Sequence, residues 1–140
     1  MLQWKILKII CNMKSYLLDT HTLIWFARQS PKLSKNGYSI ISNMQNEIFV
    51  SDISIWEIAI KMKIGKLNFE MSIKKLCEHI TNLKFNWLKI NKNHIIETLN
   101  LPLHHRDPFD RILIASAKLE NLTIITKDRN FDKYDIDILW

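Results

Sequence analysis

Four carboxylates at separate places in the 140-residue sequence could act together in metal-dependent chemistry. Asp19 and Asp128 each follow a short apolar run typical of a buried strand, whereas Glu57 and Asp110 each lie near the start of a stretch with helical periodicity. Carboxylates that share one site repel one another, so they stay ionised only beside a cation. Oxygen ligands without His or Cys suit Mg²⁺ or Mn²⁺, and such ions promote hydrolysis of phosphate esters.

Asp19 and Glu57 also have ordinary structural explanations. Asp19 is a suitable N-cap for the helical segment that follows it. Residues 54–57 have the pattern of a capping box, in which Glu57 reaches back to the amide of Ser54. Glu57 nevertheless lies on the apolar helical stripe of Ile53 and Ile60, where a carboxylate is costly unless a charged partner satisfies it. A metal ion would be such a partner, and the sequence leaves both explanations open.

The other two carboxylates are equally open to a local explanation. Asp107 and Pro108 begin a strong predicted helix as its N-cap and first residue, so capping explains Asp107. Asp110 is less well explained, because it projects on the side of Leu113, toward the predicted sheet, where the helix N-terminus favours an anion. Asp128 follows a predicted strand after one lysine, and an aspartate in a loop is usually a turn residue.

Alternating strands and helices position these residues. We expect strands over residues 16–18, 48–50, 85–90, 123–126 and 136–139, with a helix after Asp19 and further helices over 33–45, 53–64, 71–83, 92–100 and 107–120. Such alternation predicts an α/β fold, in which right-handed crossovers give a mostly parallel sheet with helices on both faces. Ligands bind at the carboxyl ends of such strands, so all four carboxylates are expected to converge on one crevice.

Length and composition predict one domain without a membrane span. Residues 1–13 are a basic, apolar stretch that we interpret as an amino-terminal extension outside the fold, which leaves residues 14–140 as the domain. No apolar run approaches the roughly 20 residues that cross a bilayer. Cys11 and Cys77 form no CxxC pair, which favours a reducing, cytoplasmic compartment over a thiolate metal site.

The net charge of +6 and the pI near 9.4 favour a polyanionic partner. Ile, Lys and Asn, however, fill 51 of the 140 positions, which indicates an AT-rich coding sequence. Part of the lysine excess therefore reflects codon usage, and the basic charge permits a nucleic-acid partner without requiring one.

Four segments, taken together and in order, resemble the PIN domain and are closest to the VapC-like toxins of bacterial type II toxin–antitoxin systems. They are LLDTH (17–21), SIWEIAIK (54–61), HRDPFDR (105–111) and ITKD (125–128). The resemblance covers residues 14–139 and implies a three-layer α/β/α sandwich that cleaves RNA with Mg²⁺ or Mn²⁺. The acidic positions that it implies for catalysis and metal binding are Asp19, Glu57, Asp110 and Asp128. The resemblance further implies polar neighbours at Thr20, Ser54 and Thr126, a cognate antitoxin and a homodimer.

Arg106 and Arg111 flank Asp110 and are candidates for binding an RNA phosphate, since Arg offers a bidentate fork. Ion pairs with neighbouring acids are the equal alternative. His104 and His105 could suggest a transition-metal site, but no third soft ligand is placed nearby in the sequence, so we interpret this loop as a positive rim.

Two other functions remain as alternatives to a ribonuclease. One is a PIN module that binds RNA or an antitoxin without catalysis, although clustered negative charges would not help it to bind an anion. The other is a receiver-like signalling domain that binds Mg²⁺, for which Asp52, after the second predicted strand, is the candidate phosphorylation site.

Overall fold

Five parallel strands form the central sheet of this protein, in the order β3-β2-β1-β4-β5. The structure is a computed structural model that describes residues 2–10 and 13–140. The strands are β1 (Ser15–Leu18), β2 (Glu47–Ser51), β3 (Asn86–Leu88), β4 (Thr123–Ile125) and β5 (Ile138–Leu139). The expected parallel sheet is confirmed, and because all strands run the same way, their carboxyl ends share one edge.

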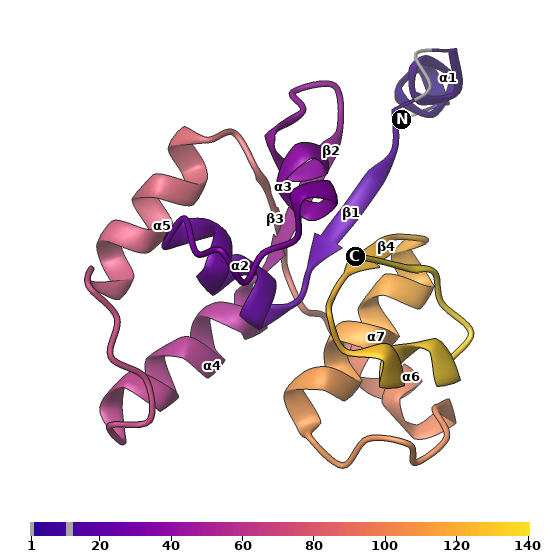
Figure 1. Cartoon of the computed structure of the whole chain (residues 1–140). Coiled ribbons are helices and arrows are strands. Elements are labelled where there is room, and N and C mark those ends of the chain that lie inside the picture. Colours follow the sequence, from indigo (N-terminus) through magenta and orange to yellow (C-terminus); the bar gives the residue numbers. More distant parts are fainter. Residues whose placement is uncertain (1, 11–12) are drawn as a thin grey trace.

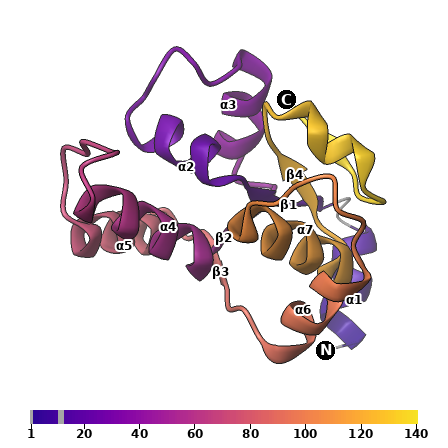
Figure 2. The ribbon, with the colours of Figure 1, turned by 90° about the horizontal axis from the view of Figure 1, so that it is seen from below.

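Helices cover both faces of the sheet and complete a three-layer α/β/α sandwich (Figures 1 and 2). The first group is α2 (Thr20–Ala27), α3 (Lys35–Ser42), α4 (Asp52–Lys63) and α5 (Ile73–Asn82); the second is α6 (Lys92–Glu97) and α7 (Pro108–Glu120). Two 3₁₀ turns, η1 (Thr98–Asn100) and η2 (Arg129–Lys133), lie in the connections. The turn η2 is absent from the sequence expectations, since its polar residues show no periodicity.

Each face of the sheet has its own apolar core. Side chains on a strand alternate between faces, so Tyr16 and Leu18 pack under α2, α3 and α5, whereas Leu17 packs under α7. Helix α4 takes part in both layers, because Ile58 lies in the first core and Ile53 packs against the second. This position carries α4 across the carboxyl edge of the sheet, in contact with α2, α5 and α7.

Short polar side chains begin the helices that follow the sheet edge. Asp19 is the N-cap of α2, as one of the two explanations for this residue predicts. Asp107 accepts hydrogen bonds from the amides of Phe109 (2.8 Å) and Asp110 (3.3 Å), which confirms it as the N-cap of α7. Asp128 likewise begins η2 by accepting from the amide of Asn130 at 2.9 Å.

Within the predicted amino-terminal extension, residues 2–10 form a helix, α1 (Leu2–Ile10). Figure 1 places it beyond the start of β1, away from the carboxyl edge. Met1, Cys11 and Asn12 lie outside the described residues. Within the described part of the chain, no helix has both the length and the apolar content of a membrane span.

Candidate active site

The four predicted acidic residues meet at the carboxyl edge of the sheet. Asp19 follows β1, and Asp128 lies beyond the end of the neighbouring strand β4. Glu57 lies in the second turn of α4, and Asp110 lies in the first turn of α7, which contacts α4. Their charges interact, since Asp19, Glu57 and Asp128 all raise the pKa of Asp110. The expected convergence of the four residues at one edge of the sheet is therefore present.

Asp19 is buried and both of its carboxylate oxygens accept hydrogen bonds. Oδ1 accepts from the amide of Thr20 at 2.8 Å, and Oδ2 accepts from the hydroxyl of Thr126 at 2.9 Å. Burial raises the pKa of Asp19, the Thr126 hydroxyl opposes that rise, and the negative charge of Glu57 adds to it. Asp19 thus caps a helix and belongs to the acidic cluster as well.

Glu57 is 5% exposed and has one satisfied and one unsatisfied oxygen. Oε2 accepts from Nζ of Lys61, one helical turn later, at 2.6 Å. Oε1 is buried and has no hydrogen-bond partner among the described residues, a situation that costs roughly 1–3 kcal/mol. The capping box predicted for residues 54–57 is wrong, because α4 begins at Asp52 and Ser51 is its N-cap.

The pKa of Asp110 is raised as well as that of Asp19. Burial, followed by the negative charges of Asp19, Asp107, Glu57 and Asp128, raises its pKa to about 7. Near neutral pH the cluster thus holds more negative charge than its surroundings stabilise. A bound divalent cation would lower the pKa of Asp110 and favour its ionised form.

An aromatic pair holds α4 against α7 beside the acids. Trp56 and Phe109 are the neighbours in sequence of Glu57 and Asp110, and their rings pack edge to face with centroids 5.5 Å apart. Such a pair contributes about 0.5–1.5 kcal/mol beyond its buried area. This contact helps to hold α4 and α7, the helices that carry Glu57 and Asp110, next to each other.

The three predicted polar neighbours link the elements of the site. Thr20 donates its hydroxyl hydrogen to Oγ of Ser54 at 3.0 Å, which joins the start of α2 to α4. Thr126 donates to Asp19 and accepts from the amide of Asp128 at 3.0 Å, which joins the ends of β1 and β4. All three hydroxyl residues are buried, so these hydrogen bonds lie inside the fold, away from solvent.

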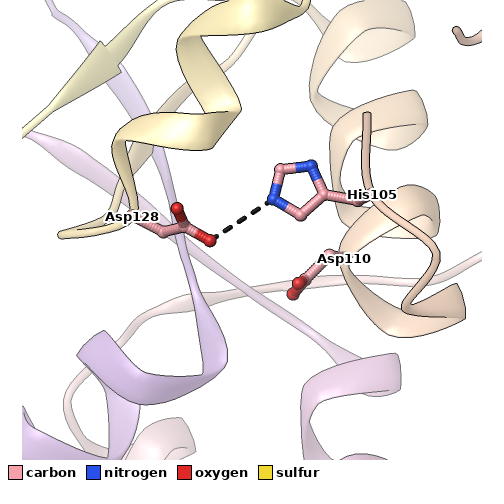
Figure 3. Close-up of side chains that lie close together, drawn as sticks. All are labelled: His105, Asp110 and Asp128. Atoms are coloured by element: carbon pink, nitrogen blue, oxygen red, sulfur yellow. Dashed lines mark hydrogen bonds and ion pairs between the residues drawn. The ribbon is translucent and has the colours of Figure 1, made fainter. Parts of the chain in front are cut away.

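His105 joins the cluster, although sequence reasoning interpreted its loop as a positive rim. Its Nε2 atom lies 3.3 Å from Oδ2 of Asp128 (Figure 3). His105, Asp110 and Asp128 each present one ligand atom, and these atoms lie within 4.8 Å of one another. The HRDPFDR segment contains both His105 and Asp110, but nothing in it indicates that Asp128, from another element, faces the ring.

Arg111 makes backbone contacts that the sequence did not predict, and its role as a phosphate contact stays a prediction. Its guanidinium donates to four backbone carbonyls of the preceding loop: Thr98 (2.6 Å), Pro102 (2.9 Å), Leu101 (3.2 Å) and His105 (3.4 Å). These bonds fix the path of the loop that brings His105 to the acids. Arg106 is exposed, and its role as a contact to an RNA phosphate stays a prediction.

Asp52, the candidate residue for a receiver-like function, lies outside this cluster. It is the first residue of α4, it is exposed, and its carboxylate accepts from the amide of Ile90 at 3.3 Å. The acidic pocket of the described chain is therefore not organised around it.

The sequence model of the PIN domain matches residues 16–137, so the chain belongs to the PIN domain family. A search of curated protein sequences gives no match to the chain.

Solved structures share this fold at low sequence identity. VapBC2 from Rickettsia felis, bound to a DNA fragment from its promoter, has a TM-score of 0.67 and 14% identity, over 89% of this chain and 97% of that one. DNA-bound VapBC from Salmonella typhimurium has a TM-score of 0.64 and 16% identity, with coverages of 91% and 98%. VapBC-1 from nontypeable Haemophilus influenzae has a TM-score of 0.60 and 20% identity, with coverages of 89% and 96%.

Proposed function

We propose that this chain is a metal-dependent endoribonuclease that hydrolyses RNA phosphodiester bonds. The observation that carries the proposal is the buried Oε1 atom of Glu57, which has no partner among the described residues and lies in a cluster of mutually repelling carboxylates. A buried, unpartnered carboxylate oxygen in such a cluster is stabilised by a cation.

The residues present fit a divalent cation. Asp19, Glu57, Asp110 and Asp128 offer carboxylate oxygens, the ligands that Mg²⁺ and Mn²⁺ prefer. When bound, the cation supplies Lewis acidity, since it lowers the pKa of a water molecule and neutralises charge on the phosphate. Thr126 keeps Asp19 oriented, as hydrogen-bonded outer partners generally do in metal sites.

Basic residues around the acids would hold the RNA backbone. Arg106 is exposed in the loop before Asp110, and Lys127 lines a groove of about 620 Å³ beside Asp128. The net charge of +6 would attract the polyanion to the protein as a whole. Hydrolysis by this route leaves 5′-phosphate and 3′-hydroxyl ends.

We further propose that the protein is the toxin of a toxin–antitoxin pair. Supporting this are the similar structures named above, which are complexes of the VapBC type and in two cases are bound to DNA. A cognate antitoxin would neutralise the toxin by placing a basic side chain against the acidic cluster and covering apolar surface. A homodimer and a cytoplasmic location complete the proposal.

Cleavage of a mixed RNA substrate in the presence of Mg²⁺ or Mn²⁺ tests the proposed activity. We expect cleavage by the purified chain, loss of cleavage in excess EDTA, and loss in Asp19→Asn and Asp110→Asn. Asp135→Asn, which changes an exposed carboxylate after η2, is the matched control and should cleave normally. Full activity in EDTA or in either site variant would contradict the metal mechanism, and RNA binding without any cleavage would favour the non-catalytic module.

A further inference from the structure

His105 lies in the loop between η1 and α7, with a side chain that is 9% exposed. Figure 3 shows its ring and the carboxylates of Asp110 and Asp128 facing a common space. We propose that these three residues form a second divalent-cation site, which favours a first-row transition ion such as Mn²⁺ over Mg²⁺. The inference rests on the proposed function, because Asp110 would be shared with a first cation held by Asp19 and Glu57.

The spacing of the ligand atoms suits coordination of one ion. An octahedral ion with ligands at about 2.1 Å places neighbouring ligand atoms about 3.0 Å apart and opposite ones about 4.2 Å apart. Nε2 of His105 and Oδ2 of Asp128 are 3.3 Å apart, and the three ligand atoms all lie within 4.8 Å of one another. Small movements of side chains are therefore enough to close the group around a cation.

Aromatic neighbours orient the imidazole for this role. The ring of His105 packs at 88° to that of Phe131, with centroids 5.0 Å apart. Its Nδ1 atom lies 3.3 Å from Oη of Tyr134, which also accepts from the amide of His105 at 2.6 Å. A proton on Nδ1, donated to Tyr134, leaves the lone pair of Nε2 free to bind a metal, the arrangement usual for ligating histidines.

Charge supplies a separate reason for a second cation. Asp19, Glu57, Asp110 and Asp128 carry four negative charges when ionised, and Lys61 is bonded to Glu57. One divalent ion added to this lysine leaves a net negative site, which would repel a phosphodiester. A second ion reverses the sign, so that the site attracts the substrate's phosphate.

The expected preference for Mn²⁺ over Mg²⁺ follows from a ligand set of one imidazole and two carboxylates. Imidazole nitrogen binds transition ions well, whereas Mg²⁺ selects oxygen ligands and retains water. The half of the cluster that holds Asp19 and Glu57 offers oxygen alone. The two halves should therefore differ in their choice of ion.

Binding of Mn²⁺ to the 140-residue chain labelled with ¹⁵N-histidine tests the inference without measuring activity. We expect calorimetry to give two Mn²⁺ ions per chain and pulsed electron paramagnetic resonance to show coupling of Mn²⁺ to an imidazole nitrogen. In His105→Gln, whose amide can still bond to Asp128, the coupling should disappear and the weaker site should lose at least ~10-fold in affinity. His104→Gln, which changes the exposed neighbour, is the matched control and should keep both signals.

The outcomes separate the inference from the proposed function. Two Mn²⁺ sites with unchanged nitrogen coupling in His105→Gln would overturn the inference, because another histidine would then be the ligand. Mn²⁺ binding without any nitrogen coupling would also overturn it and leave the oxygen-bound site intact. Absence of Mn²⁺ binding at every concentration would contradict the proposed function itself.

Discussion

The two sides of the acidic cluster are built in different ways. The inner side, Asp19 and Glu57, is buried; Asp19 follows the strand β1, and Glu57 lies on the helix α4. The outer side, His105 and Asp128, lies on connecting segments and is more exposed, with Asp128 39% exposed and His105 9% exposed. Asp110 lies between them at the start of α7.

This difference separates two tasks of one site. Buried carboxylates on rigid elements can hold a cation tightly, because their positions are fixed by the packing of the core. Ligands on connections are reached more easily by solvent and by a large substrate. The inner side is therefore suited to permanent binding of an ion, and the outer side to contact with the RNA.

The largest expected effect comes from the inner side. Glu57→Gln removes the charge of the carboxylate whose Oε1 atom has no partner among the described residues. We therefore expect kcat/KM for RNA cleavage to fall by at least ~100-fold, more than the 10–100-fold typical for residues that only support metal ligands. Asp128→Asn should cost less, about 10-fold, since it changes the exposed side. Glu78→Gln on α5 is the control, and equal losses at Glu57 and Asp128 would remove the distinction between the sides.

Arg111 should matter for the outer side alone. Arg111→Met removes four hydrogen bonds to carbonyls of the loop, so we expect the free energy of unfolding to fall by about 2–3 kcal/mol. Hydrogen exchange should accelerate over residues 98–106 and stay unchanged in β1. Arg129→Met changes an exposed arginine and serves as control; protection lost equally in β1 would contradict a local role.

Asp110, between the two sides, should link stability to pH in the metal-free protein. Its pKa is raised to about 7 by burial and by the neighbouring acids, so folding binds a proton between about pH 4 and 7 and stability falls as the pH rises through that range. Asp110→Asn removes this dependence. We expect the variant to gain on the order of 2 kcal/mol over the parent at pH 8, a value reduced for partial exposure, and nothing near pH 4.

Urea unfolding with and without Mn²⁺ measures this effect. Saturating Mn²⁺ should stabilise the parent chain at pH 8 more than the variant, because the cation replaces the missing proton. A stability difference that does not change with pH would show that the charge of Asp110 is not the cause.

The smallest expected effect concerns the hydroxyl that joins the two sides. Thr126→Val removes the bond donated to Asp19 and the bond accepted from the amide of Asp128, so we expect a loss of about 1 kcal/mol in unfolding free energy. Thr123→Val, at the start of β4, should be close to neutral. Calorimetry should also show weaker Mn²⁺ binding in Thr126→Val, and identical binding would mean that Asp19 needs no support from this residue.

Local features of the sequence were enough to predict most of the fold. Short apolar runs and β-branched residues marked the strands. The Asp107-Pro108 pair marked the start of α7, because capping acts between residues only a few positions apart. The sequence also predicted that Asp19 and Asp128 meet at one edge of the sheet, since the carboxyl ends of parallel strands lie on the same side. The helix α1, the turn η2 and the boundaries of α3 did not follow.

The sequence by itself determined which carboxylates could meet, since each is tied to the end of a strand or the start of a helix. The tertiary structure alone decided their partners: the bond from Lys61 to Glu57, the ring of His105 against Asp128, and the four carbonyls held by Arg111. The physical reason is that a side chain's burial, and the atoms within hydrogen-bond reach of it, depend on how separate elements pack. Neither quantity is written in the spacing of residues along one segment.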